Sequence, residues 1–418
     1  MASMCRRLRV GACLVFACLV TPAGRCIAAD DVPVATEAVA SGGQESRPQA
    51  KPAGSVLRAD DFRRAFRGVW APPSGGWKDG FTGSYATHEQ ARDGRTVYLK
   101  GHQSQPMRYA VLVPPEPVKT RDCKSVPRAE LVEWREIPAP PNVTDRSGIH
   151  QYGLLDTDKG LFVTFKAFYA VGGEDFPSQG MVDPAGAMCG LYRLASPAGK
   201  CDHNRVAGYM CRPPRGIDAD YLVGLCGTPG SRASSAGPSL FAVRFDPTLE
   251  AGKAQAATPI LSYVPGQGQM RDWDNITSVR GAAWIEAGDK GAVVFSGMRS
   301  VGHVWYGKPE ATAADGTTYV DRHRSSKGYH AEGYAQGLWV YDPADVRDAF
   351  HGKRRPEEVQ PVEWIDLKDL GLTLDDAPVD GWVTASFRDG RLIVGVQHGL
   401  TEGAGARLPL MLEFHLAK

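Results

Sequence analysis

The chain has 418 residues, with 48 lysines and arginines against 47 aspartates and glutamates and a formal net charge of +1. Such a balance lacks the basic footprint of nucleic-acid-binding proteins, so no nucleic-acid partner is expected. Beyond one short N-terminal run, no segment is long and apolar enough for a membrane span.

Residues 1–29 are typical of a cleaved secretory signal. The basic letters "RRLR" lead into an apolar run over 10–20, which is too short to cross a bilayer. A cut after Ala28 fits the small residues around it, and a lipoprotein cut before Cys18 is the alternative. We therefore predict a secreted or periplasmic protein, with lipoprotein anchoring as the minor alternative.

Residues 30–54 consist largely of alanine, proline, glycine, serine and glutamine, with almost no large apolar side chain. Such a stretch cannot bury enough surface to fold, so we predict a disordered linker. Cleavage of the signal removes four arginines and no acid, which leaves 44 basic against 47 acidic residues.

Five of the nine cysteines follow the signal, and an exported chain permits disulfides. They are Cys123, Cys189, Cys201, Cys211 and Cys226. The last four lie close together in sequence, and the best local pair is Cys201 with Cys211, although spacing does not fix connectivity. The isolated Cys123 is then the unpaired thiol. Zinc is the rival interpretation, but no C-x-x-C spacing supports it.

One phrase occurs twice, almost three hundred residues apart. "RDGRTVYLKGH" covers 92–102 and "RDGRLIVGVQH" covers 388–398. A tight Asp-Gly turn entering alternating apolar residues predicts a β-hairpin. Similar turns occur at 157–165, at 288–297 and, more weakly, at 218–227. Each follows another apolar stretch, such as "GSYAT" or "WVTASF", so the chain is predicted to contain five hairpins.

Each hairpin is followed by further strand-like segments. The predicted third strands are 108–115, 190–197, 239–247, 337–343 and 408–416. The predicted fourth strands are 132–137, 259–264 and 362–367. Several third strands end in a Pro after Ser or Asp, as a strand leaving into a turn does.

Four antiparallel strands repeated along a chain resemble the blades of a β-propeller. Four steps separate Gly94 from Gly390, which gives 74 residues per blade. Five such blades need nearly the length of the segment 57–418. The sequence therefore predicts an all-β fold: a five-bladed β-propeller with four-stranded antiparallel blades, formed by a single domain over 57–418.

The ring is predicted to close through its N-terminus. The chain ends just after the third strand of the last blade, which leaves an edge exposed to aggregation. The letters "DFRRAFRG" at 61–68 resemble "DVRDAFHG" at 345–352, and both are predicted to be short helices. Residues 68–70 would then supply the missing outer strand.

The resemblance to β-propellers implies that loops leading into first strands share one face with loops after second strands. Function concentrates on such loops because the blades position them rigidly. Asp79, Asp274 and Asp380 precede first strands, and His150 takes the corresponding place in the second blade. They predict a carboxylate cluster at the channel mouth, although Asp-Gly is also ordinary turn chemistry.

The ends of the second strands add polar residues at matched positions. Eight residues after the turn glycine come His102, Arg299 and His398. We interpret them as ligand-binding residues. No metal site and no cofactor are predicted, with a divalent metal at the channel as the alternative for paired histidines near acids.

The segment 299–336 is predicted to be a long loop that folds over this face. It is rich in aromatic residues, unlike disordered loops, and includes His303, Trp305 and Tyr306. Aromatic surfaces with interleaved polar groups suit sugar rings. The alternative is a loop packed on its own tyrosines.

Three functions remain open. The preferred hypothesis is a monomeric exported propeller that binds a glycan or another extracellular ligand on the loop face. The second resembles the five-bladed propeller glycoside hydrolases in architecture, with Asp79, Asp274 and Asp380 as catalytic carboxylates, but no glutamate fits the proton donor. The third is a non-catalytic scaffold. No nucleotide-binding, hydrolase-elbow or zinc-protease motif is present.

Overall fold

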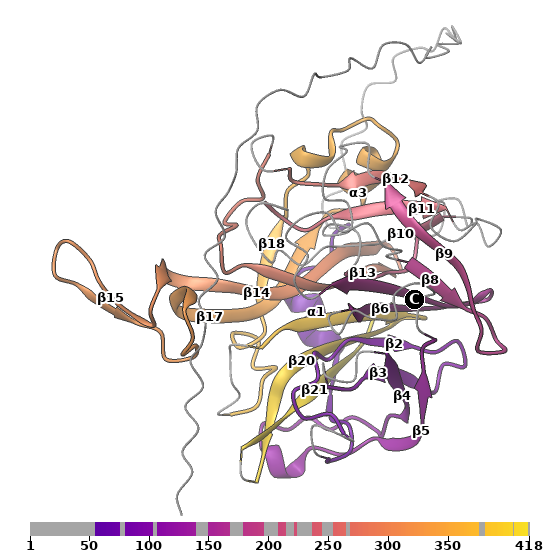
Figure 1. Cartoon of the computed structure of the whole chain (residues 1–418), viewed down its shortest axis with the longest axis horizontal. Helices are drawn as coiled ribbons and strands as arrows, with labels where there is room; N and C mark the ends of the chain where they lie inside the picture. Colours follow the sequence, from indigo (N-terminus) through magenta and orange to yellow (C-terminus); the bar gives the residue numbers. More distant parts are fainter. Residues whose placement is uncertain are drawn as a thin grey trace, which may run out of the picture. The chain divides into compact units, whose positions relative to one another are not determined.

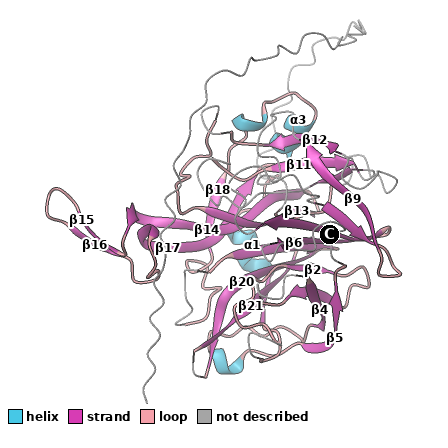
Figure 2. Cartoon of the chain, viewed as in Figure 1, coloured by secondary structure: helices cyan, strands magenta, loops and turns pink. Residues whose placement is uncertain are grey.

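Antiparallel strands dominate the structure, as Figure 2 shows. It is a computed structural model that describes residues 55–75, 80–102, 107–138, 149–167, 179–195, 208–214, 221–223, 236–244, 254–264, 268–375, 381–403 and 405–416. All of them belong to one compact unit, Lys51–Lys418. None of the helices in this described part is long and apolar enough to cross a membrane.

Three sheets contain four antiparallel strands each, and we name each sheet after its innermost strand (Figure 1). The β2 sheet has the order β2 (His88–Gln90), β3 (Val97–Lys100), β4 (Arg108–Val113) and β5 (Glu130–Glu136). The β13 sheet has the order β13 (Ser278–Ala287), β14 (Lys290–Gly307), β17 (Gly328–Tyr341) and β18 (Glu363–Asp366). The β19 sheet has the order β19 (Val383–Arg388), β20 (Arg391–Glu402), β21 (Ala406–His415) and β1 (Phe66–Trp70).

A seven-stranded sheet contains a fourth group of this kind. Its antiparallel β6 group consists of β6 (Ile149–Thr157), β7 (Gly160–Ala167), β8 (Gln179–Val182) and β9 (Met188–Ala195). Its remaining strands are β10 (Tyr221–Val223), β11 (Leu240–Arg244) and β12 (Ala254–Leu261). The two groups are joined by a parallel pairing of β12 with β9. Four-stranded antiparallel sheets with adjacent innermost strands form a β-propeller arrangement, as predicted.

The repeated phrase forms matched hairpins. The turn before β3 and the turn before β20 place Gly94 and Gly390 at φ of 69° and 84°, a left-handed conformation that favours glycine. In both cases the following strand pairs with the innermost strand of its sheet. The two similar stretches thus occupy the same position in two blades.

The N-terminal segment supplies the outermost strand of the β19 sheet, as predicted. Strand β1 pairs antiparallel with β21, and Val69 lies opposite Leu412. The same segment also reaches two other sheets. Val69 exchanges backbone hydrogen bonds with Val118, after β4, and Leu57 donates to the carbonyl of Gly291, near the start of β14. Residues 55–71 therefore act as a strap across three sheets.

Both predicted helices form. Helix α1 (Ala59–Ala65) runs directly into β1, and α3 (Pro343–Phe350) connects β17 with β18. Asp342 caps α3 by accepting a hydrogen bond from the backbone N–H of Ala344. Two short 3₁₀ turns, Cys123–Ser125 and Pro356–Glu358, complete the described helical elements.

Apolar side chains fill the spaces between neighbouring sheets. Leu99 of β3, Ile285 of β13 and Val394 of β20 belong to one buried cluster. Val111 of β4 and Leu154 of β6 belong to another. Sheets packed face to face in this way form rigid walls from which the loops extend.

Two strand assignments from the sequence need correction. The third strand of the β6 group is β8, and the predicted third strand at 190–197 is the fourth, β9. Strand β8 was missed because it has four residues and no alternating pattern. The stretch "GSYAT" at 83–87 precedes the first strand of its blade, which begins at His88.

The predicted cysteine pairing lies partly outside the described residues, because Cys201 does. Cys211 is buried, and burial raises the pKa of its thiol to about 12. Cys123, the predicted unpaired thiol, is a half-buried cysteine without a disulfide.

Candidate ligand-binding face

The innermost strands approach one another closely. A Cβ on Gly281 of β13 would collide with the backbone of Thr384 and Ala385 in β19. On the other side of β19, the Thr384 hydroxyl donates to the carbonyl of Ala86, just before β2, at 2.6 Å. Backbones this close fix the positions of the groups at both ends of these strands.

Buried His88 links the β2 sheet to the β19 sheet. Its Nδ1 lies 3.1 Å from the Thr384 hydroxyl, and its Nε2 lies 3.1 Å from the carbonyl oxygen of Ile393. Burial lowers the pKa of His88 to about 4, so the ring is neutral at physiological pH. Nδ1 also lies 2.9 Å from the carbonyl oxygen of Ala86, which accepts from the Thr384 hydroxyl. A neutral ring carries one N–H, so it donates either to the carbonyl of Ala86 or to that of Ile393.

The turn end of the innermost strands contains a buried ion-pair network. Glu89 of β2 pairs with Arg212 and lies 3.5 Å from Arg388 of β19. Arg388 and Arg212 also donate to the main-chain carbonyl of Asp156 in β6, at 2.6 and 2.9 Å. Burial raises the pKa of Glu89 to about 6, despite the nearby guanidinium groups. The network connects four chain segments at the centre of the ring.

The loop end contains a cluster of two aromatic rings and a guanidinium group. The rings of Tyr85, before β2, and Trp382, before β19, lie 4.4 Å apart. The guanidinium of Arg280 in β13 lies over Trp382, 3.6 Å from the ring centroid, and 5.7 Å from that of Tyr85. Tyr85 is buried, whereas Trp382 and Arg280 are half-buried. We call these three residues the stacked cluster.

Lys100, at the end of β3, adds a second cationic side chain near this cluster. Its side chain is buried, and burial together with the charge of Arg280 lowers its pKa to about 7. A negatively charged group or a hydrogen-bond acceptor of a ligand would raise the pKa of Lys100 and restore its charged form.

The predicted ligand-binding residues of this face separate into two groups. His102 lies at the mouth, where it forms a β-bridge with Ser84 and packs against Gly83. Burial lowers its pKa. His398 is half-buried in β20, with an unusual positive φ of 60°. Arg299, however, lies over Trp364 of the outermost strand, 4.8 Å from its centroid, and therefore away from the innermost strands.

Asp274 caps its own turn. Its Oδ1 accepts from the backbone N–H groups of Ile276 and Thr277, both at 2.7 Å, and its Oδ2 accepts from the Ser300 hydroxyl. This is the ordinary turn role considered from the sequence. Asp79 and Asp380 lie outside the described residues, and of His150 only the backbone is described. The carboxylate cluster thus stays a prediction.

The prediction that residues 299–336 form a loop folded over the face is wrong, because the segment forms two hairpins. Strands β14 and β17 continue as a paired hairpin out to Gly307 and Gly328, and a second hairpin, β15 (Glu310–Thr312) with β16 (Thr318–Val320), follows. Figure 1 shows this extension reaching away from the other sheets. Backbone pairing along both strands holds it extended.

The extension is packed on its own aromatic residues, the alternative considered from the sequence. The ring of His303 stacks on Tyr319 at 4.2 Å, and Trp305 stacks on His330 at 5.6 Å. Trp305 is half-buried, and Tyr306 has 63 % of its surface exposed. These residues are displayed to solvent but lie along the hairpin.

A buried polar group holds the extension together. His330 Nδ1 lies 2.8 Å from Asp321 Oδ2, and the Tyr334 hydroxyl donates to the same oxygen at 2.6 Å. Hydrogen bonds from these groups and from the backbone keep the pKa of Asp321 low, against the effect of burial. Within the described residues, no group of three histidine, cysteine, aspartate or glutamate side chains could hold a metal ion.

Sequence reasoning missed the stacked cluster. A signal was available in the stretches leading into the first strands: "GSYAT" and "DGWVTA" both place an aromatic residue shortly after a glycine. Arg280 carried no such signal, because only the approach of β13 to β19 brings it over Trp382.

Comparisons with known proteins assign no family to the chain. No protein-family model and no curated protein sequence matches the chain. Among solved structures, a luciferin-regenerating enzyme aligns with 81 % of this chain and 95 % of its own, at 7 % identity and a TM-score of 0.36.

Proposed function

We propose that this protein is an exported β-propeller that binds an extracellular glycan on the loop face, at the mouth formed by its innermost strands. The stacked cluster of Tyr85, Arg280 and Trp382 is the observation on which the proposal rests. It combines residues from three sheets at the end where the predicted ligand-binding loops lie.

The chemistry of the cluster suits a sugar. The apolar C–H face of a sugar ring packs against an aromatic face, while its hydroxyl groups need donors and acceptors beside that face. Trp382 is half-buried and offers the ring, and a guanidinium is planar and rich in donors. Lys100 and His102 add polar groups to the same end of the β2 sheet.

A five-bladed ring forms part of the proposal. Four innermost strands, β2, β6, β13 and β19, come from the four-stranded groups. We assign residues 208–214 as the innermost segment of a fifth blade, which β10, β11 and β12 would complete. Gly208 accepts a hydrogen bond from Thr164 of β7, and the ring of Tyr209 packs on Phe295 of β14. The segment thereby bridges the β6 and β13 sheets.

A glycan array probed with the purified protein tests the proposal. Trp382→Leu is expected to reduce binding to the captured glycan by about tenfold, since an aromatic contact contributes on the order of 1 kcal/mol beyond its buried area. Trp364→Leu is the matched control, because Trp364 also stacks under an arginine but lies on the outermost strand. Failure of the array to capture any glycan, or equal losses in both variants, would reject the proposed site.

A further inference from the structure

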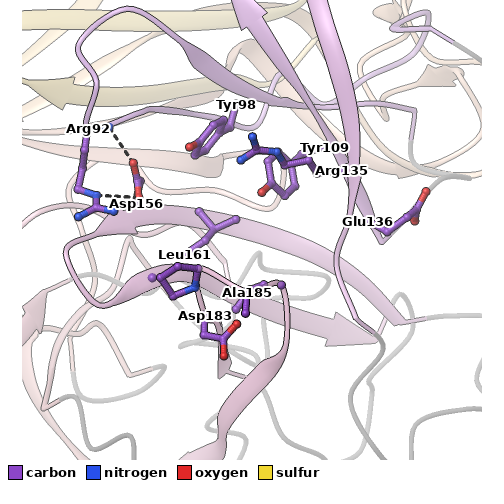
Figure 3. Close-up of a pocket in the computed structure, with 13 residues that line it drawn as sticks. Arg92, Tyr98, Tyr109, Arg135, Glu136, Asp156, Leu161, Asp183 and Ala185 are labelled. Atoms are coloured by element: carbon purple, nitrogen blue, oxygen red, sulfur yellow. Dashed lines mark hydrogen bonds and ion pairs between the residues drawn. The ribbon is translucent and has the colours of Figure 1, made fainter.

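A pocket lies between the β2 sheet and the β6 group, at the turn end of the strands and so opposite the loop face (Figure 3). Its volume is about 520 Å³, within the size range of small-molecule sites. Arg92, Tyr98 and Tyr109 line one side, and Leu161 and Val182 line the other. We propose that this pocket is a second ligand site, which takes a small molecule with a carboxylate on a six-membered ring.

Hydrogen-bond donors remain available in the pocket. The backbone N–H and the Nε of Arg92 bind the two carboxylate oxygens of Asp156, at 2.7 and 3.3 Å. Among the described residues, neither terminal nitrogen of Arg92 has a partner, and neither does the hydroxyl of Tyr98. Burial raises the pKa of Tyr98 to about 12, so this hydroxyl keeps its proton at neutral pH. A guanidinium and a phenol hydroxyl that line one pocket are donors suited to a carboxylate.

The described acidic residues in the lining leave the terminal nitrogens of Arg92 and the hydroxyl of Tyr98 without an acceptor. Asp156 is occupied by Arg92, and Asp183 accepts from the backbone N–H of Ala187 within its own turn. Figure 3 shows the side chain of Glu136 directed away from Tyr98 and Asp156. The donors of Arg92 and Tyr98 therefore remain open to a ligand.

Further guanidinium groups lie behind the pocket. Arg212 and Arg388 lie behind Asp156, and both donate to its main-chain carbonyl. Together with Arg92 and Arg135 of the lining they make four guanidinium groups, which balance the four carboxylates of Glu89, Glu136, Asp156 and Asp183.

The remaining walls suit a flat ring. The rings of Tyr98 and Tyr109 lie 5.1 Å apart at 54°, so they form an angled aromatic wall. Leu161 and Val182 are almost completely buried and form the apolar side opposite. Either a sugar acid or an aromatic acid presents this combination of a ring and a carboxylate.

Titration calorimetry at neutral pH with D-glucuronate and with benzoate tests the inference, with methyl glucoside and benzyl alcohol as the uncharged counterparts. We expect at least one acid to bind about tenfold more tightly than its uncharged counterpart, since a charge-assisted hydrogen bond contributes on the order of 1.5–3 kcal/mol. Binding of glucuronate alone identifies a sugar-acid site, and binding of benzoate alone an aromatic-acid site.

Two variants locate the binding. Tyr98→Phe keeps the ring and removes only the hydroxyl, so binding should weaken about fivefold, whereas Arg92→Lys keeps the charge and loses the fork. Arg95→Lys in the same turn and Tyr306→Phe on the extension are the matched controls and should bind as the unchanged protein does. Absence of binding by both acids, or binding unaffected in Tyr98→Phe and Arg92→Lys, would overturn the inference.

Discussion

At the turn end of the innermost strands, Arg212 and Arg388 face the buried carboxylate of Glu89, whereas at the loop end Arg280 lies over the ring of Trp382. A guanidinium paired with a buried carboxylate is engaged in holding chain segments together. One stacked on an aromatic ring adds a planar cation to an aromatic surface. Under the proposed function, the turn end serves stability and the loop end serves recognition.

Loss of the carboxylate at the turn end should have the largest effect. Glu89→Ala leaves two partly buried arginines without their partner and should lower the free energy of unfolding by about 3–5 kcal/mol. Glu133→Ala, which breaks the exposed pair with Arg135, should cost no more than about 1 kcal/mol. Denaturant unfolding of both variants checks this, and equal small losses would break the comparison.

The contact between the β2 and β19 sheets should be sensitive to acid. The pKa of His88 is about 4 in the folded protein and returns to about 6.5 when the chain unfolds. Its stabilising effect is thus present above pH 6.5 and is lost as the pH falls towards 4, by about 3 kcal/mol in total. Unfolding experiments from pH 7 to 4 should show this loss in the native protein.

His88→Gln cannot be protonated, so its stability should depend less on pH over the same range. Exposed His351→Gln is the control and should keep the pH dependence of the native protein. A parallel pH dependence in the native protein and in His88→Gln would show that another group is responsible.

Substitutions at the loop end should be smaller in effect. Asp274→Ala removes the acceptor for two backbone N–H groups and should cost about 1 kcal/mol, as the loss of a capping side chain does. Asp274→Asn keeps an oxygen that can accept these bonds and should cost less. Thermal melting distinguishes the two. If Asp274→Asn melts as the native protein does but abolishes glycan hydrolysis, the glycoside hydrolase hypothesis gains over the binding hypothesis.

The smallest effect is expected on the extension. Tyr306 is mostly exposed, so Tyr306→Ala should change the free energy of unfolding by less than about 0.5 kcal/mol. Tyr334→Phe, by contrast, removes a buried hydrogen bond to Asp321 and should cost about 1 kcal/mol. Denaturant unfolding of the pair would show whether the extension has a buried core of its own.

Sequence patterns predicted the parts of the fold that local chemistry determines. The turn at Gly94 and its counterpart at Gly390 share a left-handed glycine, and two similar short helices indicated how the N-terminus closes the last sheet. Strand β8 was missed because four residues carry no periodicity. The extension was predicted to be a folded loop because it is rich in aromatic residues. The backbone pairing of β14 with β17 depends on strand register, which aromatic content does not reveal.

The candidate site was harder to predict, because its contacts join residues far apart in the chain. Arg280 and Trp382 meet only after β13 and β19 lie side by side, and Glu89 meets Arg212 through a segment with no strand pattern. Asp274 was recognised, together with both of its possible roles, but its position in the sequence could not decide between capping and chemistry.

The strap formed by residues 55–71 imposes an order on assembly. Strand β1 is synthesised well before its partner β21. Until β21 has left the ribosome, the β19 sheet lacks the strand with which the strap pairs. A nascent chain therefore cannot complete this sheet before that point. For the export proposed above, that delay keeps this part of the polypeptide threadable through a translocation channel.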